Sequence, residues 1–280
     1  MTTLPPPDGV DGDVNDDIPV LDKDDIEDDT RDDEERRESA IAAVRGALYT
    51  ARRVVVLTGA GVSAASGVPT FRGTGGLWRN RRPEELATPQ AFALEPGAVW
   101  GFYHWRRRLL ARCTCNAAHE AIARLEEHIP ECACITQNVD GLHQAAGSRN
   151  VIELHGNIWR MRCPTCCARY EDRSPDLDAL PSCRHCGALV RPDVVWFGEP
   201  LDPDVLMRAM GAVSRCHVLL VVGTAAQVHP AATLPREAKA AGAVVVEINT
   251  DPTPLTAQAD FVLSGKAADV LHRLVSTDKP

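Results

Sequence analysis

Apolar positions along the chain follow two patterns that alternate. Continuous apolar runs are typical of parallel strands buried on both faces, and they occupy residues 52–59, 132–138, 217–224 and 243–250. Shorter runs at 151–156 and 260–265 predict two more strands. Segments with the apolar spacing or the composition of helices lie between and around these runs, at residues 41–48, 119–128, 230–242 and 267–275.

This alternation of strands and helices predicts an α/β fold with a Rossmann-like doubly wound parallel sheet. We expect this domain to comprise residues 39–155 and 194–280. Two segments interrupt the alternation. Residues 72–116 form a helical excursion rich in Trp and Arg, and residues 156–193 carry two cysteine pairs. We expect the second segment to be a small zinc-binding module.

The charge of the protein is concentrated at its N-terminus. Residues 1–38 contain 16 acidic and 4 basic residues, whereas the remainder contains 23 acidic and 26 basic ones. A segment with so many like charges and no apolar periodicity is predicted to be a disordered acidic tail. It could serve as a solubilising leader or as a regulatory, partner-binding arm.

Membrane and nucleic-acid partners are not favoured by the composition. No basic and apolar signal peptide opens the chain, and no apolar run is long enough to span a bilayer, so we expect a cytoplasmic protein. Ten cysteines in a reducing compartment do not predict disulfides. The near-neutral globular part gives no strong nucleic-acid signal. The oligomeric state is left open.

A glycine loop follows the first strand, in the stretch "VVVLTGAGVSAASGVPTFRG" at residues 54–73. Gly59 and Gly61 would let the backbone approach a pyrophosphate, whose charge the N-terminus of the following helix could stabilise. The acidic residue that dehydrogenases carry about 20 positions further on is missing, which disfavours hydride transfer. The alternative is a tight strand–helix turn without a ligand.

Two cysteine pairs predict a metal site. Cys163 and Cys166 are followed after 16 residues by Cys183 and Cys186, and two such pairs can enclose one tetrahedral Zn²⁺. Four protein ligands leave no open position, so the zinc would be structural. Four ordinary reduced thiols are the alternative, and Cys167 could exchange as a ligand, although its adjacency to Cys166 disfavours this.

Polar residues gather where two predicted strands end. Gln137, Asn138 and Asp140 follow the second strand, at the edge where open α/β sheets bind ligands. His155 ends another strand and titrates near neutrality, which suits a general base. A structural histidine is the alternative for His155 taken alone.

Several of these stretches together resemble the sirtuin family. "GAGVSAASGVPTFRG", "TQNVDGLH", "ELHG", the two cysteine pairs, "VVWFGE", "GTAAQVHP" and "EINTD" occur in sirtuin order. The resemblance extends from about residue 40 to the C-terminus and leaves out the acidic tail. It implies an enzyme that consumes NAD and removes acyl groups from lysine in proteins or peptides.

The resemblance also implies roles for individual residues. His155 would be the catalytic base, which activates a ribose hydroxyl after the acyl amide oxygen has displaced nicotinamide; the products would be free lysine, nicotinamide and O-acyl-ADP-ribose. Residues 194–198 would bind the substrate peptide as an added strand: Val194, Val195, Trp196, Phe197 and Gly198. NAD would be held by Gly59, Ala60, Gly61, Ser63, Phe71, Arg72, Trp78, Gln137, Asn138, Asp140, Gly223, Thr224, Ala225, Asn249, Thr250, Asp251 and Ala267. Ala225 departs from the family pattern, which has Ser there, and so removes one hydroxyl donor.

Tyr103 and Arg106 bear on the acyl group. Spaced three residues apart on a helix, they would share one face, and a guanidinium beside a phenol could clamp a carboxylate. The pair resembles the Tyr-x-x-Arg of sirtuins that remove succinyl, malonyl and glutaryl groups. Alternatively, Tyr103 packs in the core, Arg106 lies at the surface, and the protein is mainly a deacetylase.

Two further functions fit parts of the sequence. A mono-ADP-ribosyltransferase would share the NAD site and would leave ADP-ribose on its target. A zinc-ribbon binding module without enzymatic activity is supported only by clustered arginines at positions 79, 81, 82 and 106–108.

Overall fold

The computed structural model describes residues 23–69, 78 and 80–275, with side chains from residue 34 on. Among these residues, those up to Glu38 belong to one unit and those from Ser39 on to another. The second unit contains every predicted site residue within the described ranges.

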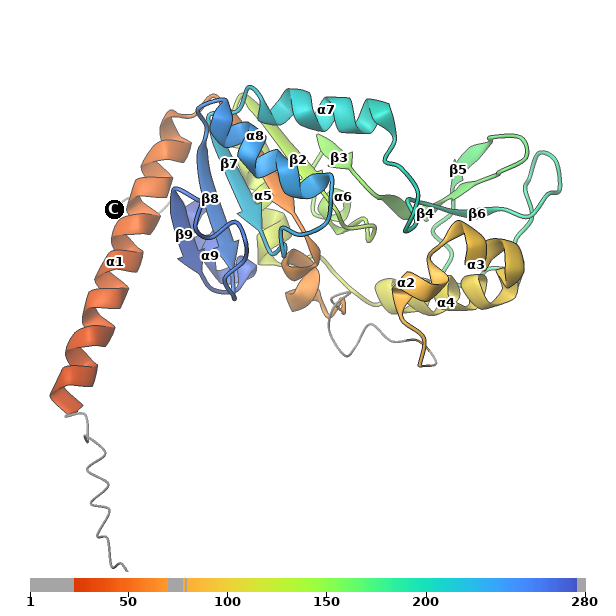
Figure 1. Ribbon diagram of the computed structural model, residues 1–280, viewed down its shortest axis with the longest axis horizontal. Coiled ribbons are helices and arrows are strands. Elements are labelled where there is room, and N and C mark those ends of the chain that lie inside the picture. Colours follow the sequence, from red (N-terminus) through yellow and green to blue (C-terminus); the bar gives the residue numbers. More distant parts are fainter. Residues whose placement is uncertain (1–22, 70–77, 79, 276–280) are drawn as a thin grey trace, which may run out of the picture. The chain divides into compact units, whose positions relative to one another are not determined.

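A six-stranded parallel sheet is the centre of the second unit (Figure 1). Its strands lie in the order β3-β2-β1-β7-β8-β9, so β1 pairs with β2 on one side and β7 on the other. The strand order therefore reverses at β1, as the doubly wound prediction requires. The strands are β1 Arg53–Thr58, β2 Glu131–Thr136, β3 Val151–Glu153, β7 Val218–Val222, β8 Val244–Asn249 and β9 Phe261–Ser264.

Helices cover both faces of this sheet, which explains why its strands read as continuous apolar runs. On one face, Ile41, Val44 and Leu48 of α1 pack into a core with α5 and α9. On the other face, α7 and α8 pack against the alternate residues of the same strands. The covering helices are α5 Ala117–His128, α7 Pro203–Val213, α8 Leu234–Ala240, α9 Ala267–Val275 and, from Ser39 on, α1 Lys23–Thr50.

The two predicted interruptions together form a second hydrophobic core. The three-stranded antiparallel sheet β5-β4-β6 packs with three helices around Trp100, Phe102 and Trp196, all almost fully buried. The described residues of 72–116, which are 78 and 80–116, thus share one core with residues 156–193. The elements are α2 Pro83–Leu86, α3 Pro89–Leu94, α4 Pro96–Leu110, β4 Gly156–Arg162, β5 Arg169–Glu171 and β6 Arg191–Val194.

Two features of the N-terminal half differ from the sequence predictions. Helix α1 begins at Lys23, inside the segment 1–38 that we expected to be disordered; residues 1–22 lie outside the described residues. Acidic residues are favourable near a helix N-terminus, and Glu34 and Arg37 form an i,i+3 pair at 4.0 Å. After the glycine loop, a short 3₁₀ helix, Ala60–Ser66, stands where an α-helix was expected, so the dipole available to a pyrophosphate is shorter than predicted.

Helix α7 was not among the predicted elements. Asp202 caps it by accepting hydrogen bonds from the N–H groups of Asp204 and Val205, and Pro203 occupies its first turn. An Asp-Pro start of this kind is a helix signal, so the sequence did contain the information. Among the described residues, no helix has the length and apolar character needed to cross a membrane.

The loops that follow β1 and β7 pack backbone against backbone. The N–H of Gly61 donates to the carbonyl oxygen of Gly223 at 2.8 Å, and that of Gly59 donates to the carbonyl oxygen of Val222 at 3.0 Å. A Cβ on Gly61 would lie 2.7 Å from the Gly223 Cα, and one on Gly223 would lie 2.5 Å from the Val62 nitrogen. Glycine is therefore required by this contact between loops, independently of any ligand.

We predict that Gly61→Ala lowers the free energy of unfolding by about 1–3 kcal/mol, because the added methyl meets backbone atoms that cannot rotate away. Gly97→Ala on α4 is the matched control, since its Cβ would have no neighbour within 4 Å. It should be neutral or stabilising by up to about 1 kcal/mol. Urea unfolding curves that are equal for the two variants would contradict the role given to this contact.

Candidate functional site

The carboxyl ends of β1, β2 and β7 meet at one edge of the sheet. Thr58 pairs with Thr136 on β2 and with Val222 on β7, so the loops that follow all three strands begin side by side. This is the point at which the strand order reverses, where open α/β sheets bind ligands. The predicted site residues of the glycine loop, of residues 137–140 and of residues 223–225 follow these three strand ends.

A buried hydrogen-bonded cluster joins the glycine loop to the loop after β2. Ser63 Oγ donates to Asp140 Oδ2 at 2.8 Å, and Asn138 Nδ2 donates to the carbonyl oxygen of Gly59 at 3.1 Å. The second carboxylate oxygen of Asp140 accepts from the N–H of Leu142 at 2.9 Å. The structure thus brings Ser63 together with Asn138 and Asp140, which lie far from it in sequence.

Two buried histidines extend this cluster and were missed by the sequence reasoning. His119 Nε2 lies 3.3 Å from Ser63 Oγ, and His143 Nε2 lies 3.0 Å from Thr58 Oγ1. Their rings meet edge to face, with centroids 5.0 Å apart. Burial lowers the pKa of both, to about 3 for His143, so both are neutral at pH 7. The capping box that Asn116 forms with His119 is the sequence signal that could have located one of them.

His155 lies half-buried, at the end of β3. Its Nδ1 lies 2.9 Å from the carbonyl oxygen of Gln137, and a carbonyl can only accept, so Nδ1 carries the proton. The lone pair of a neutral ring is then on Nε2, as a general base requires. Burial lowers the pKa of His155, and the hydrogen bond to Gln137 only partly opposes this.

A second polar group links the loops after β2, β7 and β8. Gln137 Nε2 donates to Thr224 Oγ1 at 2.9 Å, and Asn249 Nδ2 donates to the carbonyl oxygen of Thr224 at 3.0 Å. Thr250 and Asp251 follow Asn249 on the exposed side. Ala225 is half-buried beside Thr224, and Ala267 is buried at the start of α9. Thr224 follows β7, Asn249 ends β8 and Ala267 follows β9, on the side of β1 opposite to β2 and the loop of Asp140.

Of the three predicted NAD-binding residues between the 3₁₀ helix and α2, the structure describes one. Phe71 and Arg72 lie outside the described residues. Trp78 is described, and its ring meets the edge of Phe102 with centroids 6.4 Å apart. The Trp78 ring also lies close to Gly101, where a Cβ would be 3.0 Å from it. Trp78 thus packs on α4.

Tyr103 and Arg106 share a buried face of α4, with 4% and 6% of their surfaces exposed. The Tyr103 hydroxyl accepts a hydrogen bond from Trp196 Nε1 at 2.8 Å. Burial lowers the pKa of Arg106, while Tyr103 and then Asp140 oppose that shift. The alternative in which Arg106 is a surface arginine is therefore excluded, and its guanidinium lies within the electrostatic influence of Asp140.

Residues 194–198 divide into two groups. Val194 and Trp196 are buried in the core, whereas Val195 is half-buried and Phe197 is 45% exposed. The N–H of Val195 donates to the carbonyl oxygen of His155, and that of Phe197 donates to the carbonyl oxygen of Ala87, both at 2.9 Å. Gly198 has a positive φ of 85°, which ends the extended stretch.

The four cysteines of the two pairs converge. All four Sγ atoms lie within 4.8 Å of one another, and the pairs Cys163–Cys186 and Cys166–Cys183 are each 3.6 Å apart. Four sulfurs tetrahedral around Zn²⁺ would be about 3.8 Å apart, so the cluster fits a structural zinc site. The pKa of Cys163 is lowered to about 6, chiefly because the N–H of Cys166 donates to its sulfur. At Cys163 a thiolate, the form that binds zinc, is thereby favoured.

Cys167 lies outside the ligand cluster. It occupies the same position in the first turn that Gly187 occupies in the second, and both have a positive φ, of 60° and 74°. The N–H of Cys167 donates to the carbonyl oxygen of Cys163, as that of Gly187 donates to Cys183. The two turns are therefore equivalent, and Cys167 fills a glycine-like position in place of binding metal.

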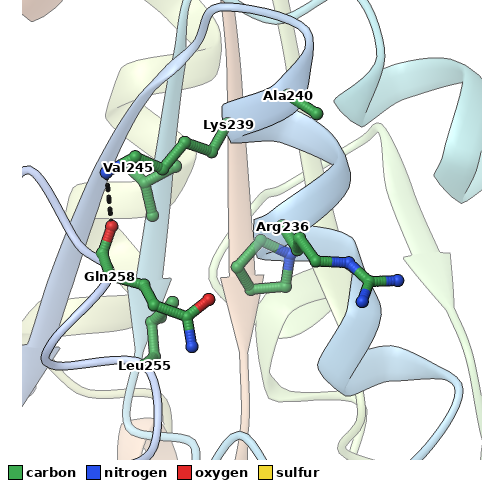
Figure 2. Close-up of a pocket in the computed structure, with 7 residues that line it drawn as sticks. Arg236, Lys239, Ala240, Val245, Leu255 and Gln258 are labelled. Carbon is green, nitrogen blue, oxygen red and sulfur yellow. Dashed lines mark hydrogen bonds between the residues drawn. The ribbon is translucent and has the colours of Figure 1, made fainter.

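Two surface cavities lie away from these residues. The cavity in Figure 2 is about 210 Å³ in volume and lies between α8 and the loop after β8. At its rim Lys239 Nζ donates to the carbonyl oxygen of Gln258 at 2.5 Å. The other lies between α7 and the edge strand β3. Neither is lined by a predicted site residue, so neither carries the predicted chemistry.

Comparison with known proteins agrees with this geometry. The model of the Sir2 family matches residues 59–230. The chain belongs to the Sir2 family. NAD-dependent protein deacylase 2 of Pyrobaculum aerophilum is 54% identical over 232 residues, which are 83% of this chain and 93% of that protein.

Solved Sir2 structures share the fold. A Sir2 homologue in complex with NAD is 51% identical, with a TM-score of 0.80 over 84% of this chain and 92% of that one. A Sir2 structure with a p53 peptide and NAD⁺ is 34% identical, with a TM-score of 0.73 over 82% and 94% of the two chains. Sir2 is the sirtuin family that the sequence resembles. The comparisons and the structure confirm three parts of that prediction: the Rossmann-like fold, the NAD dependence and the four-cysteine zinc site.

We predict that Cys167→Ser retains about one zinc per chain, whereas Cys186→Ser falls well below that ratio, because a structural site needs all four ligands. Both thiols are exposed in the structure, so exposure alone cannot distinguish the variants. Native mass spectrometry of each purified variant gives the ratio. Loss of zinc from the Cys167 variant would show that the ligand set is misassigned.

Proposed function

We propose that this NAD-dependent protein deacylase of the Sir2 family removes acidic acyl groups, such as succinyl and malonyl, from lysine in proteins or peptides. The observation that carries the proposal is the burial of Arg106 beside Tyr103 on one face of α4. A planar guanidinium beside a phenol can hold a carboxylate through several hydrogen bonds. A succinyl or malonyl chain ends in such a carboxylate.

The position of Arg106 supports a role close to the reaction. Asp140 influences its pKa, and Asp140 belongs to the cluster of Ser63 and Asn138 at the sheet edge. The family resemblance assigns this cluster to the nicotinamide and ribose part of NAD. An acyl chain that reaches the anomeric carbon with its amide would therefore have its far end near Arg106.

The proposed chemistry uses NAD as a substrate. The amide oxygen of acyl-lysine attacks the anomeric carbon as nicotinamide leaves. His155 Nε2 then takes a proton from a ribose hydroxyl, which attacks the imidate carbon. The Gln137 carbonyl fixes the tautomer of His155 for this step. Water then hydrolyses the adduct to O-acyl-ADP-ribose and free lysine, and zinc takes no part beyond supporting the fold.

The peptide would lie against residues 195–198. Because the N–H groups of Val195, Trp196 and Phe197 all donate within the chain, a substrate strand there would be held by carbonyl oxygens and by the outward side chains of Val195 and Phe197. Such contacts tolerate many peptide sequences. Specificity would then come mainly from the acyl group.

We predict that Arg106→Met lowers kcat/KM for a succinyl-lysine peptide roughly 10- to 100-fold, through a raised KM, as expected for a lost charged hydrogen bond. Acetyl-lysine, which has no carboxylate, should be affected far less. Arg108→Met is the control, because Arg108 is exposed and pairs only with Asp176 on the surface among the described residues. An equal loss on both peptides would favour a deacetylase and count against the clamp.

The pH dependence of kcat/KM should reflect His155. A general base must be neutral. Burial lowers the pKa of His155, so its ring stays neutral at pH values below those at which a histidine ordinarily becomes protonated. We predict an acidic limb in kcat/KM with its midpoint below about 6.5. His155→Asn should lower kcat about 10²- to 10⁴-fold and change NAD affinity much less. A midpoint above 7 would oppose the assignment.

A further inference from the structure

Tyr103 can bind a carboxylate only as a hydrogen-bond donor, so the direction of its existing bond matters. A phenol has one proton and can also accept. Trp196 Nε1 lies 2.8 Å from the Tyr103 oxygen, and an indole N–H can only donate. Tyr103 is therefore the acceptor in this bond, and its own proton is not used by Trp196.

The charge state of Tyr103 agrees with a donor role. Burial raises its pKa to about 12, so the phenol keeps its proton throughout the physiological range. The hydrogen bond from Trp196 and the charge of Arg106 act in the opposite direction. Both make the buried hydroxyl a better donor than burial alone would leave it.

Trp196 is itself held in place by an ion pair. Arg191 binds both carboxylate oxygens of Glu199, at 2.6 and 2.8 Å, and Glu199 Oε2 accepts from the backbone N–H of Trp196 at 2.9 Å. The guanidinium carbon of Arg191 lies 3.3 Å from the centroid of the Trp196 ring. The indole is thus fixed on its face by Arg191 and at its backbone by Glu199.

Glu199 remains charged in this arrangement. Burial raises its pKa, but the hydrogen bonds from Arg191 and from the N–H of Trp196 outweigh that effect, and the net shift is downward. Arg191 is 6% exposed and Trp196 is 2% exposed. A bidentate ion pair whose guanidinium is buried is a rigid support because its geometry is costly to break.

We propose that Trp196, supported by the Arg191–Glu199 pair, determines acyl specificity by orienting the Tyr103 hydroxyl as a donor toward the acyl carboxylate. Trp196 is thus a positioning residue, in addition to any contact with the peptide backbone. The proposal rests on the function proposed above. It adds three residues that lie outside the Tyr-x-x-Arg sequence.

The test is Trp196→Phe, which keeps an aromatic ring and removes the N–H. We expect the ratio of kcat/KM for succinyl-lysine over acetyl-lysine to fall about threefold to tenfold, the size expected for one neutral hydrogen bond. This fall should come from a change in KM. Effects of the substitution on peptide binding in general cancel in this ratio.

Trp100→Phe is the matched control. Trp100 is buried in the same core and also loses an indole hydrogen bond, but its partner is the carbonyl oxygen of Val190. It should lose stability without a change in the ratio. If Trp196→Phe does not fold, 3-benzothienylalanine at position 196 removes the N–H with almost no change of shape.

A double-mutant cycle decides whether Trp196 acts through Tyr103. On a Tyr103→Phe background there is no hydroxyl to orient, so Trp196→Phe should produce no further fall in the ratio. A fall of equal size on both backgrounds overturns the inference. An unchanged ratio for Trp196→Phe also overturns the inference if Arg106→Met abolishes the preference for succinyl-lysine. The proposed function then stands without it. A wild-type enzyme without acidic-acyl preference overturns both.

Discussion

The contact between the glycine loops after β1 and β7 is the constraint on which the site depends. At Gly61 and Gly223 the two backbones lie so close that neither could carry a side chain. This contact brings the ends of two strands together at the point where the strand order reverses. It places Ser63 on one loop and Thr224 on the other at fixed positions along the sheet edge.

From this edge, polar contacts extend into the second core. Asp140 accepts from Ser63 through its carboxylate, and its carbonyl oxygen accepts from Trp159 Nε1 at 2.7 Å. The guanidinium of Arg107 stacks on Trp159, at 4.9 Å, and binds the carbonyl oxygen of Ile158. The cysteine-bearing segment is therefore joined to this sheet edge through buried side chains.

The sequence predicted those parts of the structure that depend on local pattern. Six strands follow from apolar runs, four of them continuous, and the zinc site follows from the spacing of four cysteines. Burial of polar groups has no comparable signal: His143 was missed, His119 was missed although it forms a capping box with Asn116, and Trp196 was assigned to the peptide alone although its indole binds Tyr103. The glycines were attributed to a pyrophosphate, whereas the contact between loops already requires them. In each case the missing information is which distant residues the fold brings together.

The central claim is that this Sir2 chain breaks the glycosidic bond of NAD in order to remove an acidic acyl group from lysine. The most direct measurement is a competition between acetyl-, malonyl- and succinyl-lysine peptides of one sequence, with NAD, analysed by mass spectrometry. The account predicts equal amounts of nicotinamide, free-lysine peptide and O-acyl-ADP-ribose, with the succinyl and malonyl peptides consumed first. Preferential consumption of the acetyl peptide, or ADP-ribose left covalently on a peptide, would contradict it.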